Sequence, residues 1–203
     1  MLRIIYLISL FALLVVTPAR AQMERVPDRL DNEGKGPFEI LLIKNATMID
    51  GTGAPPEGPV NIVVQGNRIS HIIRNGDTVP ADHVIDASGM FILPGFVDTH
   101  GHNGDPIKAP QPSYGFKLWL AHGVTAVRGL GFGSGNSDPS LDQKLRSSEN
   151  TITAPRLFAY AVPGDIWSEG PIDSPRKGRN WVRWIAERGY DGVKLFNNEE
   201  PLT

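Results

Sequence analysis

Hydrophobic residues along this chain fall into short runs separated by turns rich in Gly, Pro and Asn. Between residues 37 and 88 five of these runs have the length and composition of β-strands. They span residues 38–43, 46–49, 60–65, 68–73 and 82–87. The pair Gly66-Asn67 between the third and fourth runs favours a tight turn, which predicts a β-hairpin. We expect residues 37–88 to form a small β-sandwich domain.

From residue 89 onward the pattern alternates between strand-like and helical segments. Strand-like runs cover residues 89–98, 124–130, 154–161 and 191–196, and helical spacing covers 113–122, 138–148 and a segment that begins at Ser174-Pro175. Such alternation is typical of an α/β protein with a parallel sheet. Residues 89–203 number 115, whereas a complete (β/α)8 TIM barrel needs about 250. We therefore expect a partial barrel, the first four β/α units.

The N-terminus has the pattern of a secretory signal peptide. Arg3 gives a positive start, residues 4–16 are apolar except Ser9, and Ala19-Arg20-Ala21 offers a small-x-small cleavage site. The apolar run is shorter than the about 20 residues of a membrane span. Residues 1–21 are thus predicted to be a signal peptide of a periplasmic or secreted protein with no stable membrane span after cleavage. An uncleaved anchor is the alternative, and the polar residues 22–36 are predicted to be a flexible lead-in.

Composition narrows the classes of chemistry. The chain has 203 residues, a formal net charge of −2 and no cysteine. The missing cysteine excludes disulfides, thiolate metal sites and a cysteine nucleophile. No clustered basic excess indicates a nucleic-acid partner. The glycine-rich residues 129–135 lack the G-x-G-x-x-G spacing, so we predict no nucleotide cofactor.

The candidate chemistry lies at the end of the apolar run 89–98, where His100 and His102 flank Gly101. In an extended strand these two side chains share one face, with Cα atoms about 6.6 Å apart. Neutral imidazoles are common ligands of divalent metals, and the carboxyl ends of buried barrel strands carry active sites. Spacing alone leaves two surface histidines as the alternative.

The residues around this pair carry a family resemblance. Residues 93–102 read Leu-Pro-Gly-Phe-Val-Asp-Thr-His-Gly-His, which resembles the amidohydrolase superfamily signature L-P-G-x-[IV]-D-x-H-x-H. Residues 62–69 and 84–95 also resemble family segments. Residues 123–129 are similar to G-V-T-T-V-R-D, with Gly129 in place of the usual Asp. The resemblance covers about residues 38–198 and implies a metal-dependent hydrolase of the imidazolonepropionase-like or prolidase-like branch.

The resemblance adds a third metal ligand. Lys194, in the segment Asp191-Gly192-Val193-Lys194-Leu195, sits where some amidohydrolases carry a carbamylated lysine that bridges two metals. The resemblance implies one or two divalent ions, most commonly zinc, held by His100, His102 and Lys194. A lysine that extends its amine to solvent is the alternative. Two further histidines and a general-base aspartate are expected beyond residue 203.

The implied reaction is hydrolysis of a C–N bond in an amide, peptide or cyclic amide by a metal-activated water. The substrate would be a small molecule or short peptide, and the sequence is compatible with an oligomer. On this interpretation the chain is the N-terminal part of a longer enzyme. The alternative is a non-catalytic, truncated remnant.

Overall fold

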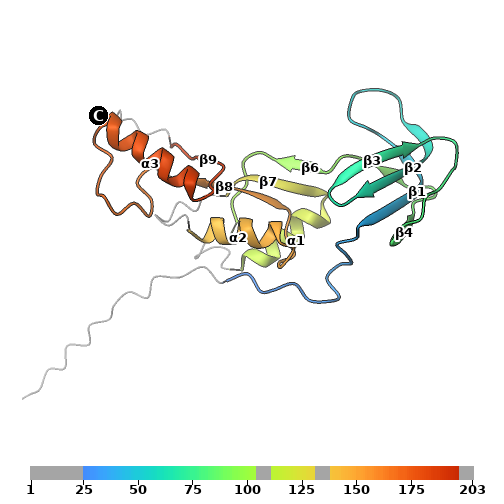
Figure 1. The fold of residues 1–203 in the computed structure, drawn as a ribbon, viewed down its shortest axis with the longest axis horizontal. Coiled ribbons are helices and arrows are strands. Elements are labelled where there is room, and N and C mark those ends of the chain that lie inside the picture. The colour runs from blue at the N-terminus through green and yellow to red at the C-terminus, as the bar shows by residue number, and fades with distance from the viewer. Residues whose placement is uncertain (1–24, 104–110, 131–137, 197–203) are drawn as a thin grey trace, which may run out of the picture.

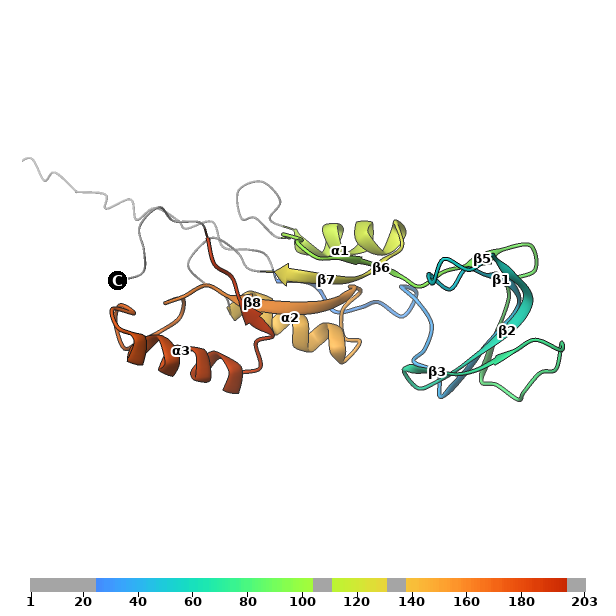
Figure 2. The same cartoon turned by 90° about the horizontal axis from the view of Figure 1, so that it is seen from above.

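The computed structural model describes residues 25–103, 111–130 and 138–196. Two sheets lie side by side along the long axis of the molecule, with α3 at the far end from β1 to β3 (Figure 1 and Figure 2). The N-terminal sheet contains β1 (Ile40–Met48), β2 (Glu57–Gln65), β3 (Arg68–Ile73), β4 (His83–Asp86) and β5 (Phe91–Ile92). The predicted signal peptide lies outside the described residues. None of the described helices is long and apolar enough to cross a membrane.

The N-terminal sheet has the order β3-β2-β1-β4, and β5 also pairs with β1. Strands β1 to β3 are antiparallel, while β4 and β5 run parallel to β1. The predicted hairpin is confirmed, since Gln65 pairs with Arg68 and Gly66 has a φ of 56°. The described residues form one sheet here, whereas the sequence led us to expect the two facing layers of a sandwich.

Strand β1 joins two runs that the sequence analysis separated. Lys44-Asn45 was expected to end the first run, but the strand continues through it as an irregularity in the pairing with β2. Asn45 takes a φ of 60°, and its N–H donates to Oδ1 of Asn61 over 2.9 Å. Because asparagine tolerates this left-handed backbone, the strand bends here without breaking.

The second sheet is parallel, in the order β6-β7-β8-β9. Its strands are β6 (Phe96–Asp98), β7 (Val124–Leu130), β8 (Arg156–Ala161) and β9 (Gly192–Val193). The intervening helices are α1 (Pro112–Ala121), α2 (Asp138–Ser148) and α3 (Pro175–Glu187). Ser174 caps α3 by accepting the N–H of Lys177, as its position before a proline predicts. The described residues thus hold three β–α pairs and a fourth strand, in agreement with a partial barrel.

One face of this sheet is covered by the helices. Val127 of β7 and Leu157 of β8 are buried in a cluster with Phe116 of α1. Ala159 and Ala161, farther along β8, are buried in a second cluster with Trp181, Ile185 and Tyr190. Buried residues therefore alternate along β8, so the intervening side chains point to the opposite, open face.

The prediction of one strand buried on both sides at residues 89–98 was wrong. Phe91 and Ile92 form β5 and pair with β1, whereas Phe96 to Asp98 form β6 and pair with β7. The run passes from one sheet to the other at Gly95, where a Cβ atom would lie 2.0 Å from Oγ1 of Thr125. Phe96 and Val97 are 60% and 59% exposed, because β6 has only β7 as a neighbour among the described strands.

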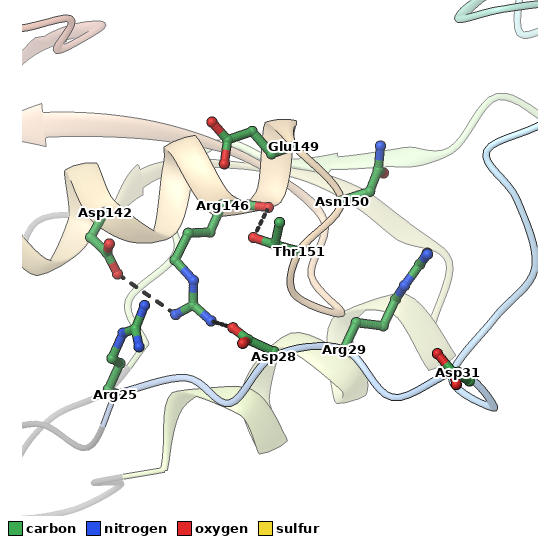
Figure 3. A pocket seen from close by; sticks show the side chains of 9 residues that line it. All are labelled: Arg25, Asp28, Arg29, Asp31, Asp142, Arg146, Glu149, Asn150 and Thr151. Atoms are coloured by element: carbon green, nitrogen blue, oxygen red, sulfur yellow. Dashed lines mark hydrogen bonds and ion pairs between the residues drawn. The ribbon is translucent and has the colours of Figure 1, made fainter.

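The described part of the lead-in, residues 25–36, is packed against the barrel half, although it contains no helix or strand. Val26 is only 3% exposed and belongs to the cluster around Phe116. Arg146 of α2 donates to the carbonyl of Val26 over 2.7 Å and to Oδ1 of Asp28 over 2.6 Å (Figure 3). Glu33 binds Lys117 of α1. A detached, flexible lead-in is therefore the wrong description of residues 25–36.

These contacts also determine which face of α2 is buried. Leu141 packs against the cluster that contains Trp181, whereas Leu145 is exposed. The buried positions are Ser140, Gln143 and Arg146. A polar face is buried because the lead-in supplies backbone and carboxylate partners for the guanidinium of Arg146.

Candidate metal centre

The two histidines follow the carboxyl end of β6 but do not continue it. An irregular turn carries them, in which the N–H of His100 donates to Oδ1 of Asp98 over 3.0 Å. Strand alternation is therefore not the reason that they converge. Their Nε2 atoms nevertheless lie 3.1 Å apart, with ring centroids separated by 5.1 Å and planes tilted by 52°. The structure brings the predicted pair together by a turn instead of a strand.

Gly101 fixes the backbone between the two histidines. Its N–H donates to the carbonyl of Arg128 over 3.0 Å, which holds the turn against β7. A Cβ atom on this residue would lie 2.5 Å from Cγ1 of Val127 and 2.9 Å from the ring of Trp119. Such distances are far below van der Waals contact, so only glycine allows the turn to pack this closely. The glycine between the histidines is a steric requirement of the site.

Asn103 is a positioning residue that the sequence analysis missed. It is 8% exposed, and its Nδ2 donates to the carbonyl of Pro112 over 2.6 Å. Gly115 makes room for it, since a Cβ there would lie 2.3 Å from Oδ1 of Asn103. The residue after His102 is thereby tied to the first turn of α1. A single asparagine has no spacing that could have marked it in the sequence.

Lys194 reaches the same place from the other edge of the sheet. Strand β9 covers only Gly192–Val193. The predicted strand of residues 191–196 was therefore too long, and Lys194 follows the strand instead of lying inside it. Its N–H still donates to the carbonyl of Ala161 over 2.8 Å. Its half-buried side chain places Nζ 2.6 Å from Nε2 of His100. All three predicted ligands therefore meet at the carboxyl ends of β6 and β9.

The geometry fits a divalent metal held by two imidazoles. Zinc binds imidazole nitrogen at about 2.0–2.1 Å, so two nitrogens on one ion at about 100° are separated by about 3.1 Å. This matches the separation of the Nε2 atoms of His100 and His102. Within the described residues no group of three or more His, Asp, Glu or Cys side chains could hold a metal. A third ligand from this part of the chain would thus have to come from Lys194.

The other three histidines, His71, His83 and His122, lie elsewhere. His71 belongs to β3, and His83 stacks on Phe38 with ring centroids 4.5 Å apart. His122 follows α1, where its Nδ1 lies 2.8 Å from the carbonyl oxygen of Leu118.

Three residues of the loop between β8 and α3, Asp165, Trp167 and Glu169, have different surroundings. Trp167 stacks edge-on against Trp184, with centroids 5.3 Å apart, in the cluster beneath α3. Asp165 is buried and Glu169 is exposed. Packing therefore accounts for Trp167.

A polar recess of about 540 Å³ lies between the lead-in and α2, away from these ligands (Figure 3). It is lined by Arg25, Asp28, Arg29, Asp31, Asp142, Arg146, Glu149, Asn150 and Thr151. Arg146 is paired with Asp28 and Asp142, so opposite charges compensate each other within the recess. We interpret it as part of the clamp that holds the lead-in.

Comparison with known proteins finds relatives that are named dihydroorotase and allantoinase. It is 39% identical over 167 residues to a dihydroorotase of Aquifex aeolicus, covering 80% of this chain and 36% of the relative. It is 41% identical over 167 residues to an allantoinase of Enterococcus faecalis, covering 77% of this chain and 32% of the relative. The chain thus spans about a third of the length of these two curated relatives. No family model matches it.

Solved structures support the fold. A Bifidobacterium longum protein assigned as a prolidase superposes with a TM-score of 0.59 at 21% identity, covering 80% of this chain and 42% of that one. At this level of identity the likeness supports the architecture, a barrel half beside a separate sheet.

Proposed function

We propose that this chain, which belongs to the amidohydrolase superfamily, binds a divalent metal through His100 and His102, with Lys194 as the third ligand. Zinc is the proposed metal, at one or two ions. The observation that carries the proposal is the 3.1 Å separation of the two Nε2 atoms, together with Lys194 Nζ 2.6 Å from one of them. Neutral imidazoles suit zinc, and a carbamylated lysine would add the carboxylate oxygens that this part of the chain otherwise lacks.

Each residue would have a defined part in such a centre. The two imidazoles supply nitrogen ligands from a turn that Gly101 and Asp98 hold in place. Lys194 approaches from β9 and would bridge two ions if carbamylated. A metal held there would lower the pKa of a bound water and polarise a substrate carbonyl. The open face beyond the strand ends would admit the substrate, as in other α/β barrels.

The reaction we propose is hydrolysis of a C–N bond in an amide, peptide or cyclic amide of small size. The names of the relatives, dihydroorotase and allantoinase, support this class. Because the chain spans about a third of those relatives, we assign the activity to a longer protein whose N-terminal part this sequence would form. The general-base aspartate and two more histidines would come from its remainder.

We also propose that the protein is periplasmic or secreted, on the basis of residues 1–21 alone. N-terminal sequencing of protein recovered from the periplasm or medium should begin at Gln22. A mature chain that begins at Met1 would contradict cleavage.

Metal content tests the proposed centre directly. Purified chain, dialysed against chelator-free buffer with zinc, should retain stoichiometric metal by elemental analysis. His100→Asn and His102→Asn together should lower zinc affinity more than about 100-fold, because two of three ligands are lost. His71→Asn, a histidine in β3, is the matched control and should retain the metal.

Turnover is tested separately in the longer protein that would supply the general-base aspartate, with a panel of dipeptides and lactams and the same variants. Metal-dependent turnover that disappears in the double variant would support the hydrolase. Retained metal in the double variant would refute the ligand assignment. Tight metal with no turnover would favour the remnant interpretation for this chain.

A further inference from the structure

Arg128 lies on the open face of the parallel sheet, opposite the helices. Its neighbour Val127 is fully buried against Phe116 of α1, and successive side chains of a strand point to opposite faces. Tyr160 has the same orientation on β8, because Ala159 and Ala161 on either side of it are buried beneath α3. These two polar side chains therefore share the face that the helices leave uncovered.

The guanidinium of Arg128 is held in one orientation. Its Nε donates to the hydroxyl oxygen of Tyr160 over 2.6 Å, and its Cζ lies 5.0 Å from the centroid of that ring. The ring lies against Gly192, where a Cβ atom would be 2.4 Å from Cε1 of Tyr160. The glycine thus admits the ring, and the ring orients the arginine. This arrangement uses one N–H of the guanidinium and leaves its two terminal nitrogens as donors.

Arg128 adjoins the candidate metal centre through the backbone on both sides. Its carbonyl accepts the N–H of Gly101, the residue between the two histidines. Its partner Tyr160 pairs with Gly192, two residues before Lys194. The guanidinium and the three predicted ligands therefore belong to one open face near the carboxyl ends of the strands.

The charge of Arg128 lacks a carboxylate partner within the described part of the chain, where no ion pair includes it. Arg74, Arg146 and Arg188 each contact an Asp or Glu, whereas Arg156 shares with Arg128 the lack of an ion pair within the described residues. Arg128 is exposed, so its guanidinium is accessible to an anion that approaches the open face. Its planar set of donors matches a carboxylate in particular.

We propose that Arg128 binds a carboxylate of the substrate and that Tyr160 positions it for that contact. This inference rests on the proposed hydrolase and narrows its substrates to small amides that carry a carboxylate near the C–N bond. Arg128 is then a specificity-determining residue, whereas His100, His102 and Lys194 hold the metal.

The test compares two probes of nearly equal size, N-acetylglycine, which is anionic, and N-acetylglycinamide, which is neutral. Binding to the zinc-treated full chain is measured by ligand-observed NMR titration. The wild type should prefer the anionic probe. Arg128→Gln should weaken it about tenfold and leave the neutral probe unchanged, because a charge-assisted contact is lost. Arg128→Lys, which keeps the charge without the planar donors, should lie between them.

Two further variants separate a specific contact from general charge. Tyr160→Phe should weaken the anionic probe about threefold and leave the neutral probe unchanged, as expected when only the orientation of Arg128 is lost. Arg156→Gln is the matched control. Arg156 is an exposed arginine at the first position of β8, whereas Tyr160 lies near the last. It should retain the full preference.

Equal binding of both probes by the wild type would overturn the proposal, and so would an unchanged preference in Arg128→Gln. The same loss in Arg156→Gln would also overturn it, since net charge would then explain the effect. Metal content is measured on the same samples. Protein that holds no metal could still prefer the anionic probe in a way that depends on Arg128. That result would contradict the proposed function and support the carboxylate site. Bound metal without a preference for the anionic probe would contradict the carboxylate site and leave the proposed metal centre intact.

Discussion

The two faces of the parallel sheet divide stability from chemistry. On the helix-covered face, Val127, Leu157 and Ala159 are buried in apolar clusters with side chains from the helices. On the open face, one residue away along the same strands, lie Arg128 and Tyr160. Adjacent residues of one strand, such as Val127 and Arg128 of β7, thus supply a core position and a polar position.

This difference shows how a short strand can do two tasks. Apolar burial on one face fixes the strand, and a strand so fixed presents its other side chains at defined positions. The candidate metal centre follows the same rule, because Gly101 packs on Val127 while the flanking histidines converge. Substitutions on the covered face should therefore alter the free energy of unfolding. Substitution of Gly101, where the histidine turn packs on the covered face, should alter both the free energy of unfolding and the affinity for metal.

The largest expected effect comes from two matched phenylalanines. Phe116 is 0% exposed beneath β7, whereas Phe96 is 60% exposed on β6. Phe116→Ala should lower the free energy of unfolding by about 3–5 kcal/mol, because it leaves a cavity in a packed cluster. Phe96→Ala should change it by less than about 1 kcal/mol. Urea denaturation followed by circular dichroism measures both, and equal losses would refute the assignment of covered and open positions.

Gly101→Ala tests the point where the turn that carries the histidines packs against Val127 and Trp119. The new methyl group would overlap Val127 and Trp119, so we expect a loss of about 1–3 kcal/mol in the free energy of unfolding. Zinc affinity should fall about tenfold or more, since the turn that holds the histidines must shift.

A second glycine provides the control for that variant. At Gly178 of α3 a Cβ would meet only Ile172 at 3.7 Å, which is ordinary contact. Gly178→Ala should therefore leave zinc affinity unchanged and stabilise the helix by up to about 1 kcal/mol. Equal zinc affinity in the two variants would show that Gly101 is not a steric requirement.

The smallest effect is a pH dependence that arises on the covered face. Burial raises the pKa of the Tyr190 phenol to about 12, from a usual value of 10.0, and Asp138 contributes. Below pH 10 the folded and unfolded states are both protonated at this residue. Between about pH 10 and 12 the unfolded chain loses a proton that the folded chain retains, so stability should fall as pH rises, by on the order of 1–2 kcal/mol.

Urea denaturation at pH 9, 10 and 11 would measure this slope. Tyr190→Phe should reduce it, because the phenylalanine ring fills the same space without an ionisable hydroxyl. Tyr114→Phe is the control, since Tyr114 is largely exposed and should contribute little. A slope that persists unchanged in Tyr190→Phe would show that other groups cause it.

Local features were predicted well because they depend on neighbouring residues. The hairpin at Gly66, helix α2 over Asp138–Ser148 and strand β7 over Val124–Leu130 lie where the sequence placed them. Helical and strand periodicities, caps and turns are short-range, so they can be read without knowing the fold. The order of strands and helices follows from them, and with it the partial parallel barrel.

Non-local features were predicted poorly. The hydrophobic run 89–98 carries no mark of where it leaves one sheet for another, since its division depends on whether β1 or β7 is the adjacent strand. The packing of residues 25–36 depends in the same way on Arg146, 118 residues from its partner Asp28. A polar segment looks detached until the residues that satisfy its backbone are known.

The sequence by itself determined the elements, their order and the three candidate ligands His100, His102 and Lys194. Only the tertiary structure decided that these ligands meet, and by which route. His100 and Lys194 are separated by 94 residues, and strand alternation was the wrong reason to expect the two histidines on one side. The turn closes because Gly101 packs against β7 and α1, and that contact exists only once strand and helix have come together.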